Sequence, residues 1–296
     1  MARYILILFA VAAVGCQKLR EGVVREIAFP DHEPALAITA KITEGDSVVW
    51  AVVYRSAGVL DSAGSIPAED AVVAVRWGGV ERWAWSGSSG TLEATPGAGW
   101  TWQTGEEVVL EAEAAGLPLA TAQATVPPPA EGTATLVLGA DTVSAIWTED
   151  ILIEDRYAVD VVNHTGAHDR YLIAVEQRTG PGMWMALWAE PDLASSERLD
   201  FNLYAGGFLV DDLGLDQTPL SNFTFTLTRW PDDPVSPDDF RIRVVSLSEA
   251  VYQHYVSLAD YSASADNPFA EPASVFGNIA GGYGIFGLQR EQVLPW

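Results

Sequence analysis

The feature that most constrains the fold of this chain is a two-residue alternation of apolar and polar side chains. Between Leu36 and Ile42 every second residue is apolar, and Thr39 and Lys41 fall in between. This period places the apolar side chains on one face of a strand. Similar segments follow at 47–54, 71–77, 80–85, 108–114, 119–126, 142–148, 157–163, 170–176, 183–188, 221–230 and 241–245. The sequence therefore predicts a mostly β protein.

The 296 residues suffice for about two domains. Seven or so short strands within 35–127 predict an N-terminal immunoglobulin-like β-sandwich. The proline-rich stretch at 128–132 predicts a stiff linker, because consecutive prolines favour an extended backbone. Residues 133–296 are expected to form a second β-rich domain with one C-terminal helix.

One hairpin is predicted with its register. Gly78 and Gly79 separate two alternating runs, and a two-residue hairpin turn needs positive φ at both central positions. This register places Arg76 opposite Glu81, a cross-strand pair of opposite charge.

A helix is predicted at about 247–261. Ser246 and Glu249 have the spacing of a capping box, in which each side chain accepts a hydrogen bond from the backbone at the other position. The expected buried face contains Val251, Tyr252, Tyr255, Leu258 and Ala259. His254 lies on the opposite side, where we expect it to be solvated.

The first residues have the pattern of an export signal. The apolar run Tyr4–Val14 would rise about 16 Å as a helix, roughly half the thickness of a bilayer core, so a signal peptide is predicted at 1–15. Its end, Ala13–Cys16, resembles the lipobox of bacterial lipoproteins, in which the cysteine is lipidated and becomes the first residue. Cys16 is the predicted lipidation site, residues 16–34 form its tether, and the absence of an acidic residue after the cysteine favours the outer membrane. The alternative is an ordinary signal peptide whose cysteine is incidental.

Charge excludes one class of partner. The chain carries 16 basic and 40 acidic residues, a net charge of −24. Such a surface repels phosphate, so nucleic-acid binding is not expected. With a single cysteine the chain has no internal disulfide and no CxxC motif, and we expect no cofactor and no metal.

A C-terminal block gives the chain a family resemblance. Asn267–Pro272, then Asn278 and Ile279, then Gly282–Gly287 are similar to the C-terminal signature of the DUF4249 family, lipoproteins typical of the Bacteroidetes lineage. The resemblance implies a cell-envelope protein, often associated with TonB-dependent outer-membrane receptors. It implies no catalytic residues.

The same block has a physical interpretation as a closing element of the core. Gly282, Gly284 and Gly287 permit positive φ or a close approach of backbones, and Pro268 and Pro272 fix φ. The apolar side chains expected to fill the core beside the helix are those of Phe269, Ile285 and Phe286.

Two groups of residues are candidates for ligand contact. Trp83 and Trp85 share a strand face by alternation, as do Trp100 and Trp102, and exposed rings of this kind stack on sugars, although core packing is the default for tryptophan. The acidic clusters lack the spacing of a calcium loop, and calcium binding stays an open alternative there. These clusters are Asp211, Asp212 and Asp216, and Asp232, Asp233, Asp238 and Asp239. His164 and His168 are expected to be exposed turn residues.

No motif of an enzyme class is present, so we expect no enzymatic activity. The predicted function is that of a lipid-anchored binding or accessory partner of an outer-membrane uptake system. The alternatives are a glycan-binding surface lipoprotein that uses the four tryptophans and, third, a hydrolase with an acidic pair in a cleft.

Overall fold

The computed structural model describes residues 32–58, 66–86, 90–96, 100–145, 150–164, 168–192, 199–212, 220–233, 236–265, 271 and 273–294. Residues 34–296 form one compact unit, and the fold below is that of this unit. The leader at 1–15, Cys16 and most of the tether at 16–34 lie outside the described residues and stay predictions. Within the described part of the chain, no helix is both long and apolar enough to span a membrane.

The prediction of a mostly β protein is confirmed. The strands are β1 (Leu36–Thr43), β2 (Val49–Arg55), β3 (Ile66–Pro67), β4 (Val72–Trp77), β5 (Val80–Ser86), β6 (Thr91–Ala94), β7 (Glu107–Glu113), β8 (Ala120–Thr125), β9 (Gly132–Ser144), β10 (Ile151–Val161), β11 (Arg170–Gly180), β12 (Met183–Ala186), β13 (Glu190–Pro191), β14 (Asp200–Asn202), β15 (Gly207–Asp211), β16 (Leu220–Arg229), β17 (Phe240–Leu247) and β18 (Gly282–Leu294). The described helices are the 3₁₀ turn η1 (Pro237–Asp239) and α3 (Glu249–Ala265).

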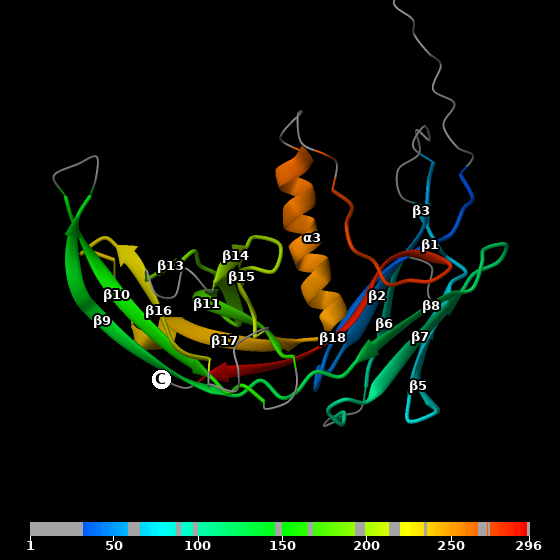
Figure 1. The fold of residues 1–296 in the computed structure, drawn as a ribbon, viewed down its shortest axis with the longest axis horizontal. Helices are drawn as coiled ribbons and strands as arrows, with labels where there is room; N and C mark the ends of the chain where they lie inside the picture. The colour runs from blue at the N-terminus through cyan, green and yellow to red at the C-terminus, as the bar shows by residue number, and fades with distance from the viewer. Residues whose placement is uncertain are drawn as a thin grey trace, which may run out of the picture. The chain divides into compact units, whose positions relative to one another are not determined.

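The largest sheet joins strands from both sides of 128–132. Its main order is β14-β15-β11-β17-β18-β1-β2-β3, with β12 beside β11 and β6 beside β2. β18 pairs in parallel with β1, in a register that places Leu36 opposite Gly282, and antiparallel with β17 (Figure 1, red beside blue). Because β1 precedes the predicted linker and β17 and β18 follow it, one hydrogen-bonded sheet spans this boundary.

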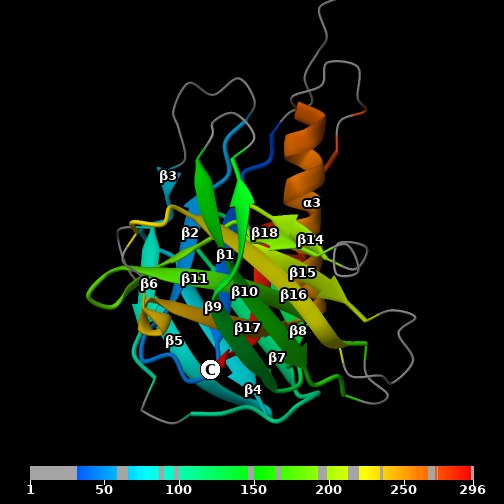
Figure 2. The ribbon, with the colours of Figure 1, turned by 90° about the vertical axis from the view of Figure 1, so that its left-hand side faces the viewer.

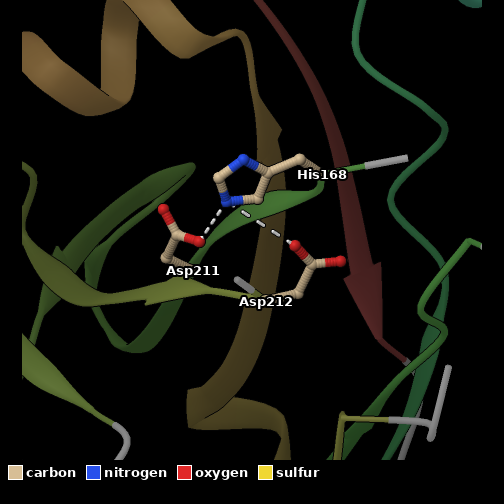
Figure 3. Close-up of side chains that lie close together, drawn as sticks. All are labelled: His168, Asp211 and Asp212. Carbon is tan, nitrogen blue, oxygen red and sulfur yellow. Dashed lines mark hydrogen bonds and ion pairs between the residues drawn. The ribbon is translucent and has the colours of Figure 1, made fainter. Parts of the chain in front are cut away.

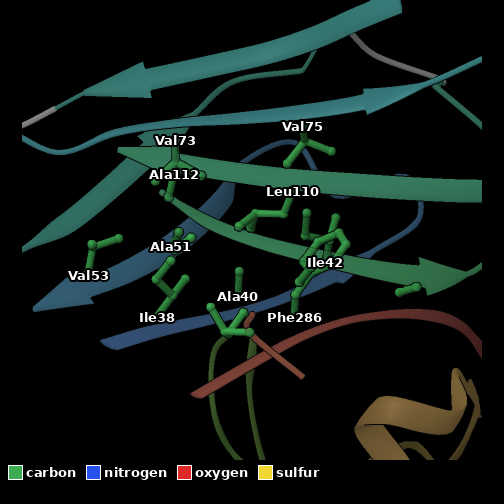
Figure 4. Packing of buried hydrophobic residues seen from close by; sticks show 14 of the residues in the cluster. Ile38, Ala40, Ile42, Ala51, Val53, Val73, Val75, Leu110, Ala112 and Phe286 are labelled. Carbon is green, nitrogen blue, oxygen red and sulfur yellow. The ribbon is translucent and has the colours of Figure 1, made fainter. Parts of the chain in front are cut away.

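Two smaller sheets pack on this large sheet around separate cores. The sheet β5-β4-β7-β8 packs against β1, β2 and β18, and its core contains Ile38, Leu110 and Phe286 (Figure 4). The sheet β13-β16-β10-β9 packs against β11 and β17, and its core contains Tyr157 and Ile242. Figure 2 looks onto β9, β10 and β16 of this second small sheet.

The side chains of β18 show which face of the large sheet each layer covers. Phe286 belongs to the first core and Leu294 to the second, and both are even-numbered, so they point to the same face of the strand. A methyl group on Gly287 would instead meet Val251 of α3. Both small sheets therefore cover one face of the large sheet, and α3 covers the other. The predicted linker at 128–132 separates two cores but not the sheet beneath them.

The predicted β4–β5 hairpin is confirmed. Gly78 and Gly79 have φ of +59° and +73°, and Arg76 pairs with Glu81 across the two strands. A nitrogen of Arg76 lies 3.3 Å from a carboxylate oxygen of Glu81, and the same guanidinium is paired with Glu111 on β7.

The glycine-rich block closes the first core, but Phe286 fills it on the face of the large sheet opposite α3, whereas the sequence predicted a place beside the helix. Gly281 has φ of +75° and Gly284 of +101°, and a side chain at either position would collide with a backbone oxygen, that of Leu119 or that of Ile38. Only glycine fits a backbone that is both left-handed and this close to its neighbour. Phe286 is fully buried among the core side chains of β1 and β4 (Figure 4).

Asn278 fixes the position of this block. Its side-chain oxygen accepts a hydrogen bond from the Phe286 N–H, and its amide nitrogen donates to the carbonyl oxygens of Phe286 and Gln123. The block is thereby bonded to itself and to β8. Phe269, Pro268 and Pro272 lie outside the described residues.

The helix is confirmed, but its predicted cap is wrong. α3 begins at Glu249, and Ser246 is a buried residue of β17. Local sequence favoured a helix start at Ser246, but pairing with β11 and β18 on both sides keeps the backbone extended as far as Leu247. The helix buries Val251 against the large sheet.

A buried arginine lies between the two cores. Arg290 of β18 is 6% exposed, and its guanidinium donates to the carbonyl oxygens of Trp102 and Pro127, to Thr104 and to Glu44. These four partners belong to the part of the chain before 128–132. The arginine thus ties the C-terminal strand to the layer above it.

The fit between β18 and β1 can be tested with Gly284→Ala. The added methyl group would meet the Ile38 carbonyl oxygen at a left-handed residue, so we expect the free energy of unfolding to fall by about 3 kcal/mol or more. The control is Gly45→Ala: Gly45 has φ of +84° with no atom within 4 Å of the added methyl, so it should lose only about 1–2 kcal/mol. Urea denaturation measures both, and equal losses would contradict this contact.

Candidate functional site

The described residues bring one set of metal-type side chains together: His168, Asp211 and Asp212 (Figure 3). His168 lies just before β11, Asp211 ends β15, and these strands are antiparallel neighbours that place Arg170 opposite Asp211. Two backbone contacts hold the strand ends, since the Asp212 N–H donates to the Asp169 carbonyl oxygen and the Asp169 N–H to Asp212 Oδ1. The strand pairing therefore builds the cluster.

The three side chains converge on one point. His168 Nε2 contacts Asp211 Oδ1 directly and lies 3.8 Å from Asp212 Oδ1, and the three ligand atoms lie within 4.8 Å of one another. Arg170 completes the cluster: its Nη2 is 3.1 Å from His168 Nδ1, and its Nε is 3.4 Å from Asp211 Oδ2.

Arg170 determines what this cluster can do. Its guanidinium only donates, so His168 Nδ1 must accept and the proton of the neutral ring must sit on Nε2, which donates to Asp211. In this tautomer Nε2 carries the proton and Nδ1 is occupied by Arg170, so both ring nitrogens are engaged within the cluster. The geometry is that of a hydrogen-bonded charge network among His168, Arg170 and Asp211.

Asp212 connects the cluster to a second, buried carboxylate, that of Asp169. Burial raises the pKa of Asp212, and the carboxylates of Asp169 and Asp211 raise it further. Asp169 is 1% exposed and accepts hydrogen bonds from the Tyr171 hydroxyl and the His164 N–H. Burial raises the pKa of the Tyr171 hydroxyl as well. The Asp169 carboxylate thus holds His164, three residues after the end of β10.

A cavity of about 710 Å³ adjoins the cluster. It is bordered by His168 and Arg170, by Ser248 and Glu249 at the start of α3, and by Thr125 at the end of β8. The cavity gives the cluster access to solvent.

Comparison with known proteins identifies the family. The family model described as "Domain of unknown function (DUF4249)" matches residues 25–293. The chain belongs to the DUF4249 family. No curated protein and no solved structure matches it. The resemblance read from Asn278 and Gly282–Gly287 is thereby confirmed.

The tryptophans of this DUF4249 protein pack against one another. Trp83 and Trp100 meet edge to face with ring centroids 4.8 Å apart, and so do Trp100 and Trp102. Trp77, which sequence analysis missed, joins them 4.9 Å from Trp83. Trp102 is 5% exposed. The side chain of Trp85 lies outside the described residues. The described rings thus form a packed cluster against the first core instead of an open row.

The remaining sequence candidates have structural partners. His254, expected to be solvated, is half-buried with Nδ1 2.9 Å from the Phe276 carbonyl oxygen, and burial lowers its pKa. Asp233 accepts from the Trp230 N–H, and Asp239 accepts from the Ser236 N–H. These two acids cap turns. Asp216 lies outside the described residues.

The raised pKa of Asp212 predicts a pH-dependent effect of Asp212→Asn. Because the folded state binds the proton more tightly than the unfolded chain, whose carboxyl pKa is about 3.8, ionisation of Asp212 lowers stability as pH rises through its folded pKa. Asparagine cannot ionise and keeps the acceptor oxygen. We therefore expect Asp212→Asn to be more stable than the wild type at pH 7, with a difference that shrinks as the pH falls toward about 4.

Asp70 provides a control of opposite sign. Hydrogen bonds from the Ala115 N–H and from Arg55 lower its pKa, so Asp70→Asn should be less stable than the wild type at pH 7. Urea denaturation at the two pH values measures both variants. If Asp212→Asn is less stable than the wild type at neutral pH, the raised pKa of Asp212 in the folded protein is contradicted.

Proposed function

We propose that this DUF4249 protein is a lipid-anchored component of the cell envelope, held at the outer membrane through Cys16. Its folded part acts as a non-catalytic binding or accessory partner of an outer-membrane uptake receptor of the TonB-dependent type. The leader at 1–15 and the lipobox ending at Cys16 support the anchor.

The observation that carries the binding role is an uncharged rim on a strongly acidic protein. The segments 181–189 and 201–210 contain no charged residue, although the chain as a whole carries −24. Several large apolar side chains of these segments are exposed, with Leu203 at 80% and Trp188 at 67%. We call this set the apolar rim; its members are Met183, Met185, Trp188, Leu203 and Tyr204.

Two contacts join the segments of the apolar rim. The rings of Trp188 and Phe201 have centroids 4.4 Å apart, and a methyl group on Gly206 would lie 3.5 Å from the side chain of Ala186. Tryptophan, tyrosine and methionine are enriched where proteins meet partners, and charged residues are depleted there. Contiguous exposed apolar surface on a soluble body marks an interaction site.

We also propose an immunoglobulin-like arrangement for 36–126. One layer pairs β1 with β2 and β2 with β6, and the other has the order β5-β4-β7-β8. This agrees with the two-layer strand pairing of immunoglobulin sandwiches, in which the first, second and fifth strands form one sheet. β6 is the fifth strand here when the two-residue β3 is not counted. A rigid sandwich next to the tether suits a body that presents a surface to a receptor.

The anchor is tested with Cys16→Ser. Without the thiol no acyl chain can be attached, and each buried methylene contributes about 0.8 kcal/mol to membrane binding. We expect the variant to move from the membrane fraction to the soluble fraction, while Gln17→Ala stays in the membrane. Mass spectrometry of the membrane-bound wild type should show an acylated cysteine at its N-terminus, and an unmodified one there would refute the anchor.

The apolar rim is tested by photo-crosslinking in intact cells. A photoreactive amino acid in place of Leu203 or Trp188 should give an adduct with an outer-membrane barrel receptor, identified by mass spectrometry. The matched control is Val80, which is 51% exposed at the tip of the β4–β5 hairpin. Equal adducts at Val80 and Leu203, or none at either rim position, would contradict the proposal.

A further inference from the structure

One long edge strand of this fold has no protection against pairing with another chain. β9 is the outermost strand of the sheet β13-β16-β10-β9, and among the described residues it pairs only with β10 (Figure 1). An open edge presents backbone N–H and C=O groups to any extended chain, so natural proteins shorten such strands, cover them, or place charges or proline on them. From 132 to 140 the sequence contains no charged residue and no proline.

The other edge strands of the described sheets carry such protection. β3, β13 and β14 have two or three residues, and β6 and β12 have four. β5 carries Glu81 and Arg82, and the backbone of Thr121 on β8 is hydrogen-bonded in both directions to that of Ala280. β9 has 13 residues and is the exception.

The backbone of β9 points to the open side at every second residue. The Val162 N–H donates to the Glu131 carbonyl oxygen, so the odd-numbered residues of the regular stretch 132–137 face β10. The N–H and C=O groups of Ala134 and Leu136 therefore point away from β10, and no described residue is bonded to them. These groups are available to an added strand.

The side chains of β9 show what an added strand would cover. Leu136 and Leu138 pack on the second core, yet both are only half-buried at the open edge. On the opposite face Thr133 and Thr135 are exposed, and Val137 is 53% exposed. A strand beside β9 would bury apolar surface on one face and meet mostly hydroxyl-bearing side chains on the other, so its residues should alternate between apolar and polar.

Charge decides which strand fits this edge. The uncharged stretch ends at an acidic residue on each side, Glu131 and Asp141, and both are exposed. In an antiparallel pair of two β9 strands centred on Leu136, Glu131 of each copy would lie opposite Asp141 of the other, and like charges directly opposite are destabilising. A second copy of the chain is therefore disfavoured. Basic residues at both ends of the added segment are favoured.

We propose that β9 receives an extended segment of another protein as an additional strand. The segment has alternating apolar and polar residues and a lysine or arginine at each end. Main-chain hydrogen bonds to Ala134 and Leu136 provide affinity, and the side chains and terminal charges provide specificity. This surface is separate from the apolar rim, and the proposal does not rest on the receptor role given to the rim.

The test uses the full chain in detergent and a probe peptide of about nine residues, in which threonine and valine alternate between two terminal lysines. We expect a dissociation constant of about 10⁻⁵–10⁻⁴ M, because the interface is small. At a tenfold excess of free peptide over this constant, hydrogen exchange at the Ala134 and Leu136 amides should slow about tenfold. The Thr135 amide already faces β10 and is the internal control. Mass spectrometry with residue-level fragmentation measures all three.

Two variants separate strand addition from folding. Leu136→Pro removes an N–H that faces the open side, so it should fold and yet bind the peptide about tenfold more weakly or less. The double variant Glu131→Lys and Asp141→Lys changes only exposed side chains, which keeps the test valid if the proline variant does not fold. It should prefer the same peptide with terminal glutamates by about tenfold, whereas the wild type prefers the peptide with terminal lysines.

Four results would overturn the proposal. The first is no slowing of exchange at Ala134 and Leu136 with the lysine-ended peptide at about 1 mM. The second is equal binding of the two peptides by the wild type, and the third is unchanged binding by a folded Leu136→Pro variant. The fourth is a dimer that protects the same two amides without peptide, because the occupant would then be a second copy.

Discussion

The fold depends on the buried guanidinium of Arg290. Tyr171, Ser246 and Arg290 stand opposite one another on β11, β17 and β18, so their side chains form one polar row across a mostly apolar face. The row runs between the two hydrophobic cores. A buried charge needs partners, and Arg290 finds Glu44 at the end of β1, in its own sheet, and the backbone carbonyls of Trp102 and Pro127 in the layer above. Removal of this arginine would leave Glu44 with the Trp102 N–H but without its ion-pair partner, so Arg290 adds a polar tie to the layers that the first core already joins.

Local patterns were enough to predict the elements that are decided locally. The alternation from Leu36 to Ile42 identified β1, because burial on one face imposes a period of two whatever the partner strand is. The turn at Gly78 and Gly79 determined its own register, since few residues other than glycine adopt positive φ twice in succession. The closing role of Gly284 followed from the same conformational argument. None of these predictions required knowledge of residues far away in the sequence.

Elements decided by distant pairing could not be predicted. The parallel pairing of β1 with β18 joins positions 246 residues apart, such as Thr43 and Gln289. Neither segment contains a sequence signal that indicates the other as its partner strand. Ser246 was misassigned because its capping pattern is local while its hydrogen bonds come from β11 and β18. The first part of β9 was missed because Gly139 interrupts its alternation; the structure shows a bulge there, with the Gly139 N–H bonded to buried Asp155. The His168 cluster was invisible for the same reason, since Asp211 lies 43 residues away.

The distribution of charge connects this fold to its proposed role. Several of the few arginines form ion pairs with buried or half-buried carboxylates: Arg229 with Asp155, Arg170 with Asp211, and Arg241 with Glu176. The acidic excess therefore remains on the outer surface, where it opposes contact between two copies of the chain. The apolar rim itself contributes no charge, because none lies within 181–189 or 201–210, although Glu190 and Asp200 adjoin these segments. A partner that approaches the rim gains apolar burial without bringing acidic surfaces together, so a different protein with a neutral or basic face fits there better than a second copy.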